Sequence, residues 1–236
     1  MSRLVWDRTG ERYYETGTKN GVLYPMSGTT YGKGVAWNGL TAVTESPSGA
    51  EANPLYADDI KYLEMRSAEE FGGTIEAYTY PDEWAQCDGS AYPTEGVQLG
   101  QQSRIPFGFC YKTVLGNDTE LDTHGYKLHL IYNATASPSE RAYQTVNDSP
   151  EAITFSWEFS TTPINVTGYK PVACITIDST KVDSTKLAAL EDILYGKDAV
   201  AADATANPPI EAADAVDPRL PLPDEIIAHF SNTSGS

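Results

Sequence analysis

The sequence predicts a mostly β (α+β) protein, an antiparallel β-sandwich or barrel with one flanking α-helix. Three observations predict this fold class. Apolar and polar residues alternate in many segments up to about residue 180, the 236 residues include 15 Tyr and 19 Gly, and a sustained helical pattern follows the strand-like region. Aromatic residues favour half-buried strands, and glycine favours the turns between them. About seven or eight such strands are typical of a sandwich or barrel.

The strands are predicted from a period of two. In ITFSWEFS (153–160), apolar and polar residues alternate, so one face of the strand is expected to be buried. That face consists of Ile153, Phe155, Trp157 and Phe159. The segment GYKLHLIY (125–132) shows the same alternation. Further strands are expected at 59–66, 74–80, 107–114 and 170–177.

A helix is predicted near 183–195, within DSTKLAALEDILYG (183–196). Asp183 or Ser184 serves as the N-cap, and Gly196 lies where a glycine commonly follows a helix. Three leucines share one helical face, namely Leu187, Leu190 and Leu194. A helix of this length is marginally stable alone, so this face must pack on the subunit's own sheet or on a neighbouring subunit.

A second helical signal lies in SAEEFGG (67–73). Ser67 and Glu70 have the spacing of a capping box, and two glycines follow them. This pattern predicts about one helical turn that interrupts the series of strands.

The composition changes after Gly196. Residues 1–196 are expected to form one β domain, whereas 197–236 are rich in Ala, Asp and Pro and indicate a C-terminal arm or linker. Apolar residues near its end are candidates for anchoring it: Leu220, Leu222, Ile226, Ile227 and Phe230.

The formal net charge is −17, from 33 acidic and 16 basic residues. This balance disfavours binding to nucleic acids, which depends on Lys and Arg releasing counterions, and to anionic membranes. The N-terminus lacks an apolar signal segment, and no stretch approaches the roughly 18 apolar residues of a membrane span. Cys87, Cys110 and Cys174 form neither a metal motif nor a disulfide framework, so we expect synthesis in a reducing cytoplasm.

No segment carries a catalytic motif. GTTYGKG (28–34) is one residue shorter than a P-loop, and Gly34 stands where that motif requires Ser or Thr. Thr123 and His129 replace the Gly and the Glu that a calcium loop requires. A Gly-x-Ser-x-Gly elbow is missing from the sequence as well. We therefore expect no enzyme, no cofactor and no metal site.

Several long segments carry a family resemblance. They are GVLYP (21–25), YGKGVAWNGLTAVTESPSGAEANPLYADDIKYL (31–63), SAEEFGGTIEAYTYPDEWAQCDGSA (67–91), GQQSRIPFGFCYKTVLGND (100–118) and NDSPEAITFSWEFSTTPINVTGYKPVACITIDST (147–180). Together they resemble the major tail proteins, or tail tube proteins, of long-tailed, non-contractile bacteriophages and prophages. The resemblance covers about residues 5–195 and leaves out the C-terminal arm.

The resemblance implies a structural protein of the virion, with a β-sandwich or barrel and a flanking helix. Hexameric rings of such subunits stack into the tail tube that conducts DNA during ejection. The implied partners are further copies of the chain, the tape measure protein, the tail terminator and baseplate or distal tail proteins. The implied location is the phage tail, after synthesis in the host bacterial cytoplasm. DNA is expected to pass through without specific binding, in keeping with the acidic chain.

The resemblance also suggests a role for LTAVTESPSGAEANPLYADD (40–59), a long polar segment without a core of its own. We expect an extended loop that stacks on the next ring, because long loops in compact domains are commonly functional. The candidate interface residues are Trp37, Leu40, Leu55, Tyr56, Leu187, Leu190 and Leu194. The candidate lumen charges are Glu64 and Glu76.

Two alternatives stay open at this point. One is the inner tube of a contractile injection system, a related architecture with a sheath outside. The other is a β-sandwich module on the virion surface that binds a receptor or a glycan. That module requires exposed aromatic residues at loop tips, for which Trp84 and Tyr92 are the candidates.

Overall fold

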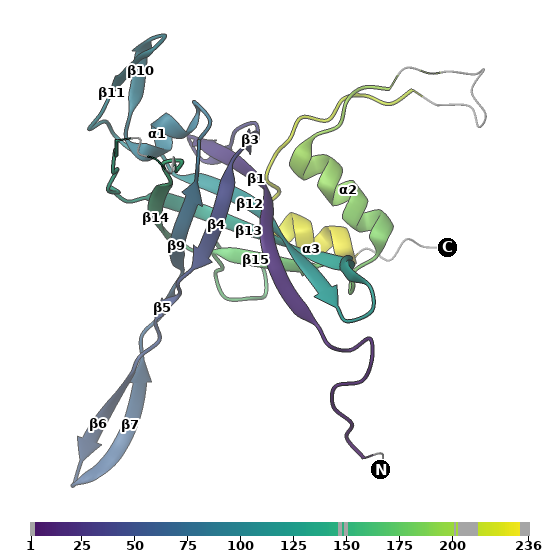
Figure 1. Ribbon diagram of the computed structural model, residues 1–236. Helices are drawn as coiled ribbons and strands as arrows, with labels where there is room; N and C mark the ends of the chain where they lie inside the picture. The colour runs from purple at the N-terminus through teal and green to yellow at the C-terminus, as the bar shows by residue number, and fades with distance from the viewer. Residues whose placement is uncertain (1–2, 146–147, 149–150, 201, 203–211, 232–236) are drawn as a thin grey trace.

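The computed structural model describes residues 3–145, 148, 151–200, 202 and 212–231. It confirms a mostly β fold with a large antiparallel sheet and few helices (Figure 1). The strands are β1 (Tyr14–Ser27), β2 (Thr30–Tyr31), β3 (Val35–Trp37), β4 (Leu40–Glu45), β5 (Ser48–Gly49), β6 (Ala52–Ala57), β7 (Ile60–Arg66), β8 (Glu69–Glu70), β9 (Gly72–Ala77), β10 (Ala91–Thr94), β11 (Val97–Leu99), β12 (Phe107–Asn117), β13 (Leu121–Ala136), β14 (Phe155–Thr161) and β15 (Cys174–Asp178). The helices are α1 (Trp84–Asp88), α2 (Ser184–Tyr195) and α3 (Pro223–Ser231).

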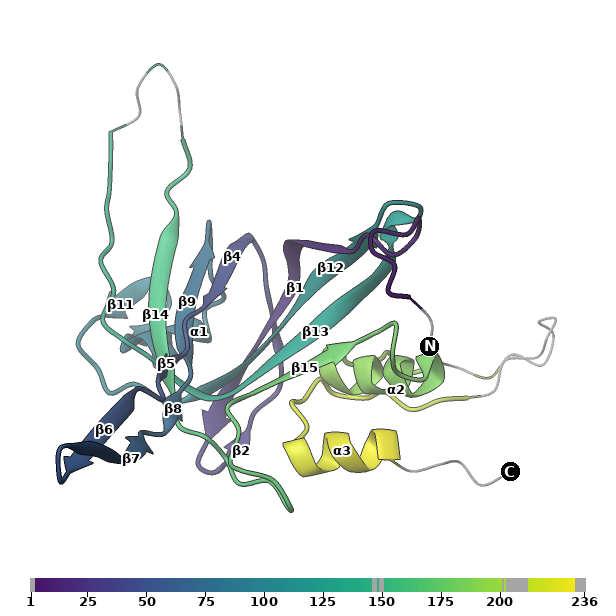
Figure 2. The same cartoon turned by 90° about the horizontal axis from the view of Figure 1, so that it is seen from below.

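Among the described residues, nine strands form one sheet in the order β2-β1-β12-β13-β14-β9-β4, with β15 also paired to β13 and β3 to β1. The sheet is folded over into two halves, which open like a V (Figure 2). Strands β1, β12 and β15 lie in one half, and β14, β9 and β4 lie in the other. The long strand β13 joins the halves, because residues 127–131 pair with β15 and residues 134–136 pair with β14. The two halves are the facing layers of the predicted sandwich.

The six strands expected from the sequence are present, with shifted ends. Trp157 and Phe159 are buried on β14 as predicted, but Ile153 precedes the strand and is exposed. Strand β1 is not among the predicted strands. Its first half is polar and largely exposed, and its second half has four consecutive buried residues, so neither half alternates between apolar and polar residues.

The inner core fills the space between the two halves of the sheet, and its centre is a group of tryptophans. The ring of Trp37 lies 4.7 Å from that of Trp84 on α1 and 5.6 Å from that of Trp157 on β14. Trp37 Nε1 also donates a hydrogen bond to Thr79 O at 2.9 Å. Aromatic pairs of this kind contribute roughly 0.5–1.5 kcal/mol beyond the burial of their surface. The group therefore ties three distant chain segments into one core.

The outer core lies on the other face of the sheet, under helices α2 and α3 (Figures 1 and 2). Strand β13 contributes Leu128, Leu130 and Tyr132, which confirms the alternation predicted for 125–132. Tyr24 Oη crosses this core and donates to Leu194 O at 2.6 Å. The bond anchors the end of α2 to strand β1.

Helix α2 confirms the helix predicted near 183–195. Asp183 caps it, since its Oδ1 accepts a hydrogen bond from Lys186 N at 3.0 Å. The leucine face packs on the subunit's own sheet, and Leu187, Leu190 and Leu194 are buried in the outer core. These three side chains are therefore not available to a neighbouring subunit in this fold.

The end of the predicted C-terminal arm packs on the β domain. Helix α3 lies beside α2, and Leu220 and Ile226 are buried in the outer core. Arg219 N donates to Ile193 O at 2.9 Å, and Tyr132 Oη donates to Pro221 O at 3.0 Å. Residues 218–231 thus belong to the same folded unit as the β domain. The middle of the predicted arm, 203–211, lies outside the described residues.

We expect Leu190→Ala to lower the free energy of unfolding by about 2–5 kcal/mol, because it leaves a cavity between α2 and the sheet. Leu190 is 1% exposed. Leu121→Ala is the matched control, since Leu121 is exposed at the β12–β13 turn and its loss should change stability by about 0.5 kcal/mol or less. Urea denaturation measures both values. Equal losses in the two variants would contradict the assignment of α2 to this core.

Candidate assembly surface

A long β-hairpin leaves the sheet between the adjacent strands β4 and β9 (Figure 1). We call residues 48–70 the arm hairpin. It consists of a short stem, β5 with β8, and a longer blade, β6 with β7. At its tip, Asp58 and Asp59 have φ angles of 51° and 63°. Two consecutive left-handed residues form the type I′ turn that favours a tight hairpin.

The arm hairpin corrects two sequence-based expectations. Residues 40–59 are not an extended loop, because they form β4, β5 and β6, each paired with a later strand. Residues 67–73 are not a helical turn, because the backbone there forms one side of the stem. Ala50 N, for example, donates to Ala68 O at 3.3 Å. Strand pairing thus overrides the local capping pattern.

The blade lies outside both cores. Every residue of β6 and β7 is exposed. Even so, the blade carries a series of large apolar side chains, namely Leu55, Tyr56, Ile60, Tyr62, Leu63 and Met65. Gathered exposed apolar groups of this kind mark an interaction surface.

The register divides the blade into two faces. In antiparallel strands, directly paired residues share a face and successive pairs alternate between faces. A register shift between Leu55 and Tyr56 makes Tyr62 an extra residue on β7 and leaves the alternation along β6 intact. One face, called the apolar face below, carries Asn53, Leu55, Ala57, Ile60, Leu63 and Met65.

The opposite side of the blade is called the charged face. It carries Ala52, Pro54, Tyr56, Lys61, Glu64 and Arg66. The carboxylate of Glu64 pairs with Lys61 Nζ, and its Oε1 lies 3.0 Å from Arg66 Nη2. The Lys61 contact first, and then the Arg66 contact, hold the pKa of Glu64 below its ordinary value. The predicted lumen charge Glu64 is therefore paired within its own hairpin.

The other predicted interface residues are divided between the inner core and the blade. Trp37 is buried in the inner core, and Leu40 packs against that core partly buried. Leu55 and Tyr56 are both exposed, but they lie on opposite faces of the blade. Glu76, the second candidate lumen charge, is partly buried on β9. The structure thus brings Leu55 together with residues that the sequence-based prediction left out.

The missed residues are Ile60, Leu63 and Met65. The sequence feature that could have indicated the hairpin is the pair Asp58–Asp59 between two strand-like segments, because two such residues suit a tight hairpin turn. This signal is short, and the residues on either side of it do not show a single buried face. The blade was therefore not recognised as a paired element.

The glycan-binding alternative required Trp84 and Tyr92 to be exposed at loop tips. Trp84 is instead fully buried on α1, with its ring 4.9 Å from that of Phe107. Tyr92 is exposed on β10. The two aromatic residues therefore do not form a stacking platform for a sugar.

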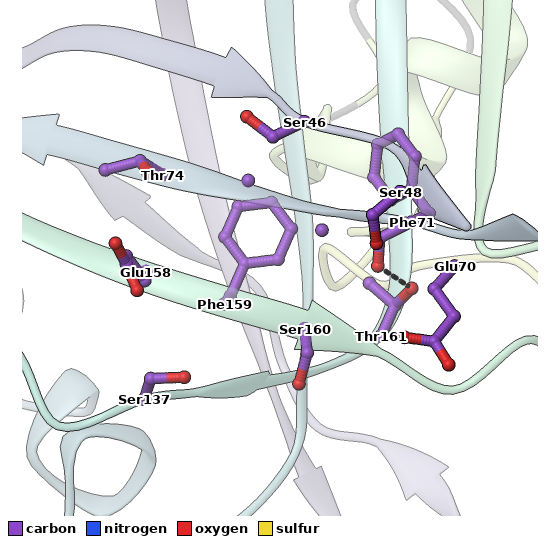
Figure 3. A pocket seen from close by; sticks show the side chains of 12 residues that line it. Ser46, Ser48, Glu70, Phe71, Thr74, Ser137, Glu158, Phe159, Ser160 and Thr161 are labelled. Atoms are coloured by element: carbon purple, nitrogen blue, oxygen red, sulfur yellow. Dashed lines mark hydrogen bonds between the residues drawn. The ribbon is translucent and has the colours of Figure 1, made fainter. Parts of the chain in front are cut away.

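A polar hollow of about 330 Å³ lies where the arm hairpin joins the sheet (Figure 3). Its lining consists largely of hydroxyl groups, including those of Ser46, Ser137 and Ser160, around the ring of Phe159. Thr161 Oγ1 donates to Phe71 O at 2.6 Å and secures the foot of β8. The lining also includes the carboxylates of Glu70 and Glu158, so it offers both donors and acceptors of hydrogen bonds.

Glu45 connects the foot of the arm hairpin to the other half of the sheet. Tyr111 Oη donates to Glu45 Oε1 at 2.7 Å, and His129 Nδ1 lies 3.5 Å from the same oxygen. The ring of His129 stacks on Tyr111, with centroids 4.6 Å apart. The His129 contact first, and the Tyr111 contact with it, hold the pKa of Glu45 below its ordinary value despite partial burial.

The described residues hold no group of three or more His, Cys, Asp or Glu side chains suited to a metal ion. All three cysteines are free, and burial raises the pKa of the Cys87 and Cys110 thiols to about 12. Thiols with such pKa values are poor nucleophiles at neutral pH. Within the same part of the chain, no helix has the length and apolar character that crossing a membrane requires.

Comparison of the chain with protein-family models gives no match, and comparison with curated proteins gives none either. The family resemblance derived from the sequence therefore stays a prediction.

We expect the stability that Glu45 contributes to depend on pH. Its folded-state pKa lies below the ordinary value of 4.5, so the contribution is present above that pH and is lost as the pH falls through the folded-state pKa. Glu45→Gln should unfold more easily than the wild type at neutral pH, and the difference should shrink between about pH 5 and pH 3. Urea denaturation at several pH values measures this difference.

The matched control is Glu95→Gln, which changes an exposed carboxylate in the β10–β11 turn. Its stability should follow that of the wild type at every pH. A difference for Glu45→Gln that stays constant from neutral to acidic pH would show that the carboxylate charge of Glu45 does not join the two halves of the sheet.

Proposed function

We propose that this protein is the tail tube subunit of a long-tailed, non-contractile bacteriophage or prophage. In this proposal, hexameric rings of the chain stack into the tube that conducts DNA during ejection. The observation that carries the proposal is the arm hairpin, whose apolar face is exposed and extends away from both cores. The resemblance of five sequence segments to tail tube proteins supports the same function.

The arm hairpin has the properties of a segment that a binding partner stabilises. An isolated two-stranded hairpin is marginally stable in water. Removing apolar surface from water contributes roughly 25 cal/mol per Å², so a neighbour that covers the apolar face stabilises both the hairpin and the assembly. Because the blade belongs to one end of the subunit, its docking on a different surface of the next copy produces a continuing stack.

The edges of the sheet support assembly within a ring. Strands β2 and β4 end the main path of the sheet, and each pairs with one neighbour along that path. An unpaired strand edge presents backbone N–H and C=O groups that another chain can bind. Contacts at these edges and contacts through the arm hairpin would extend the assembly in two different directions.

The charge of the chain suits a conduit for DNA. The net charge of −17 makes an assembled tube strongly negative, so DNA is repelled from its walls and slides without specific binding. Glu64 and Glu76 are the candidate lumen charges in this proposal. Its partners are the tape measure protein, the tail terminator and baseplate or distal tail proteins, and its location is the phage tail.

The test compares the two faces of the blade. Ile60 on the apolar face is 66% exposed and Tyr56 on the charged face is 70% exposed, so they form a matched pair. We expect Ile60→Ser to raise the critical concentration for polymerisation by about tenfold or more, because burying one such side chain contributes about 1.5–3 kcal/mol. Tyr56→Ser should change it by less than about threefold. Sedimentation and negative-stain microscopy of the purified proteins measure polymerisation.

Both variants should keep the circular dichroism and the free energy of unfolding of the wild type, because neither residue belongs to a core. Normal tubes from Ile60→Ser, or an equal rise in the critical concentration of the two variants, would show that the apolar face is not part of the interface. A wild-type protein that stays monomeric at high concentration would contradict the proposed function itself.

A further inference from the structure

The apolar face of the arm hairpin requires a complementary surface on the next copy of the chain. In a head-to-tail stack, that surface lies at the end of the subunit opposite to the blade. Figure 1 shows which segments occupy this end. The hairpin formed by β10 and β11 extends there, whereas the blade extends from the other end. Both hairpins lie on the side of the molecule away from α2 and α3 (Figures 1 and 2).

The β10–β11 hairpin presents an apolar surface. Tyr92, Val97 and Leu99 are between 41% and 49% exposed. Glu95 is the one charged residue among positions 91–100. A second apolar protrusion therefore stands at the end of the subunit opposite to the blade.

The β10–β11 hairpin is firmly attached to the inner core. Gln102 N donates to Gly89 O at 2.9 Å and closes its base. Ile105 N donates to Gln86 O at 3.1 Å just below. These residues adjoin α1, whose Trp84 is fully buried among the tryptophans of the inner core. The hairpin is thus a supported platform and suits a fixed contact.

The distribution of charge favours contact between these two hairpins. Copies of a chain with net charge −17 repel one another, so contacts are favoured where charge is low. The blade, residues 52–66, holds three acidic and two basic residues, and the bases pair with Glu64. The β10–β11 hairpin adds one acid. Contact between them brings few unpaired charges together.

The N-terminal segment is the competing candidate, because Leu4, Val5 and Trp6 are also exposed. Figure 1 shows this segment at the same end of the molecule as the blade. In a stack, the next copy is shifted along the axis, and this shift moves its N-terminal segment away from the blade of the first copy. The geometry favours the β10–β11 hairpin over the N-terminal segment.

We propose that the apolar face of the arm hairpin of one copy docks on the β10–β11 hairpin of a second copy in the adjacent ring. The contact brings Ile60 and Met65 of the blade against Val97 and Leu99. This inference rests on the proposed function, since it names the surface on which the arm hairpin of a stacked ring binds.

Cysteine cross-linking tests the contact. All variants carry Cys174→Ser, because Cys174 is partly exposed whereas Cys87 and Cys110 are buried. Ile60→Cys protein is mixed with an equal amount of Val97→Cys protein, assembled, and oxidised mildly. A disulfide requires Cα atoms within about 7 Å, so we expect at least about tenfold more covalent dimer in the mixture than in either protein alone. A second pair, Met65→Cys with Leu99→Cys, should give the same result.

Two mixtures serve as controls. Ile60→Cys with Leu121→Cys tests chance collision, because Leu121 is exposed at the β12–β13 turn. Ile60→Cys with Trp6→Cys tests the competing N-terminal segment. Both should give no more dimer than the single variants. Circular dichroism of each variant verifies the fold before mixing.

The outcomes separate this inference from the proposed function. The inference is overturned, and the proposed function left standing, by tubes that cross-link between positions 60 and 6. The same holds for tubes in which one or both of the blade pairs, 60 with 97 and 65 with 99, give no more dimer than the single variants. Wild-type protein that forms neither rings nor tubes overturns both. Tubes with dimers specific to the two blade pairs support both.

Discussion

The architecture depends on one corner in strand β13. On one side of Asn133, residues 127–131 pair with β15, and on the other side, residues 134–136 pair with β14. Asn133 has a φ of 47°, which residues other than glycine rarely adopt. Its backbone N donates to Tyr31 Oη at 2.9 Å, and its Nδ2 donates to Thr162 O at 3.1 Å. The surrounding structure thus holds the chain in a conformation that turns the sheet.

The corner explains why the protein has two cores. Before it, Leu130 and Tyr132 point into the outer core under α2 and α3. Ile131 and, beyond the corner, Ala134 belong to the inner core between the two halves. Because β13 is buried on both faces, a change in its register would disturb both cores at once. The position of the β14–β9–β4 half, from which the arm hairpin extends, follows from the same corner.

The arm hairpin obeys a different constraint from the rest of the chain. The two cores bury the large side chains of the sheet and of α2, whereas the blade contributes to neither core. Its tight turn and cross-strand pairs define its shape, and its apolar face is left for a partner. Glu45, bonded to Tyr111 and close to His129, attaches its foot to the opposite half of the sheet. The projecting element is therefore joined to the most buried part of the fold.

Local structure could be predicted from the sequence in several segments that have one buried face. The alternation in 125–132 predicted part of β13, and the leucine spacing after Asp183 predicted α2. Short elements such as α1 gave no periodic signal. In the blade, the sequence predicted the strand at 59–66 but not its pairing with residues 52–57, because the blade is exposed on both faces.

The surface that covers each apolar face could not be predicted from the sequence and is seen in the folded chain. The sequence left open whether Leu190 packs within the subunit or against a neighbour, and it placed Trp37 at an interface, whereas both residues lie in cores. A periodic pattern in the sequence indicates that one face of an element is apolar. Which surface packs on that face depends on segments far away in the chain. The corner at Asn133 brings those segments together. For this reason, the folded chain is needed to tell the apolar residues that lie in a core from those that stay exposed on the blade.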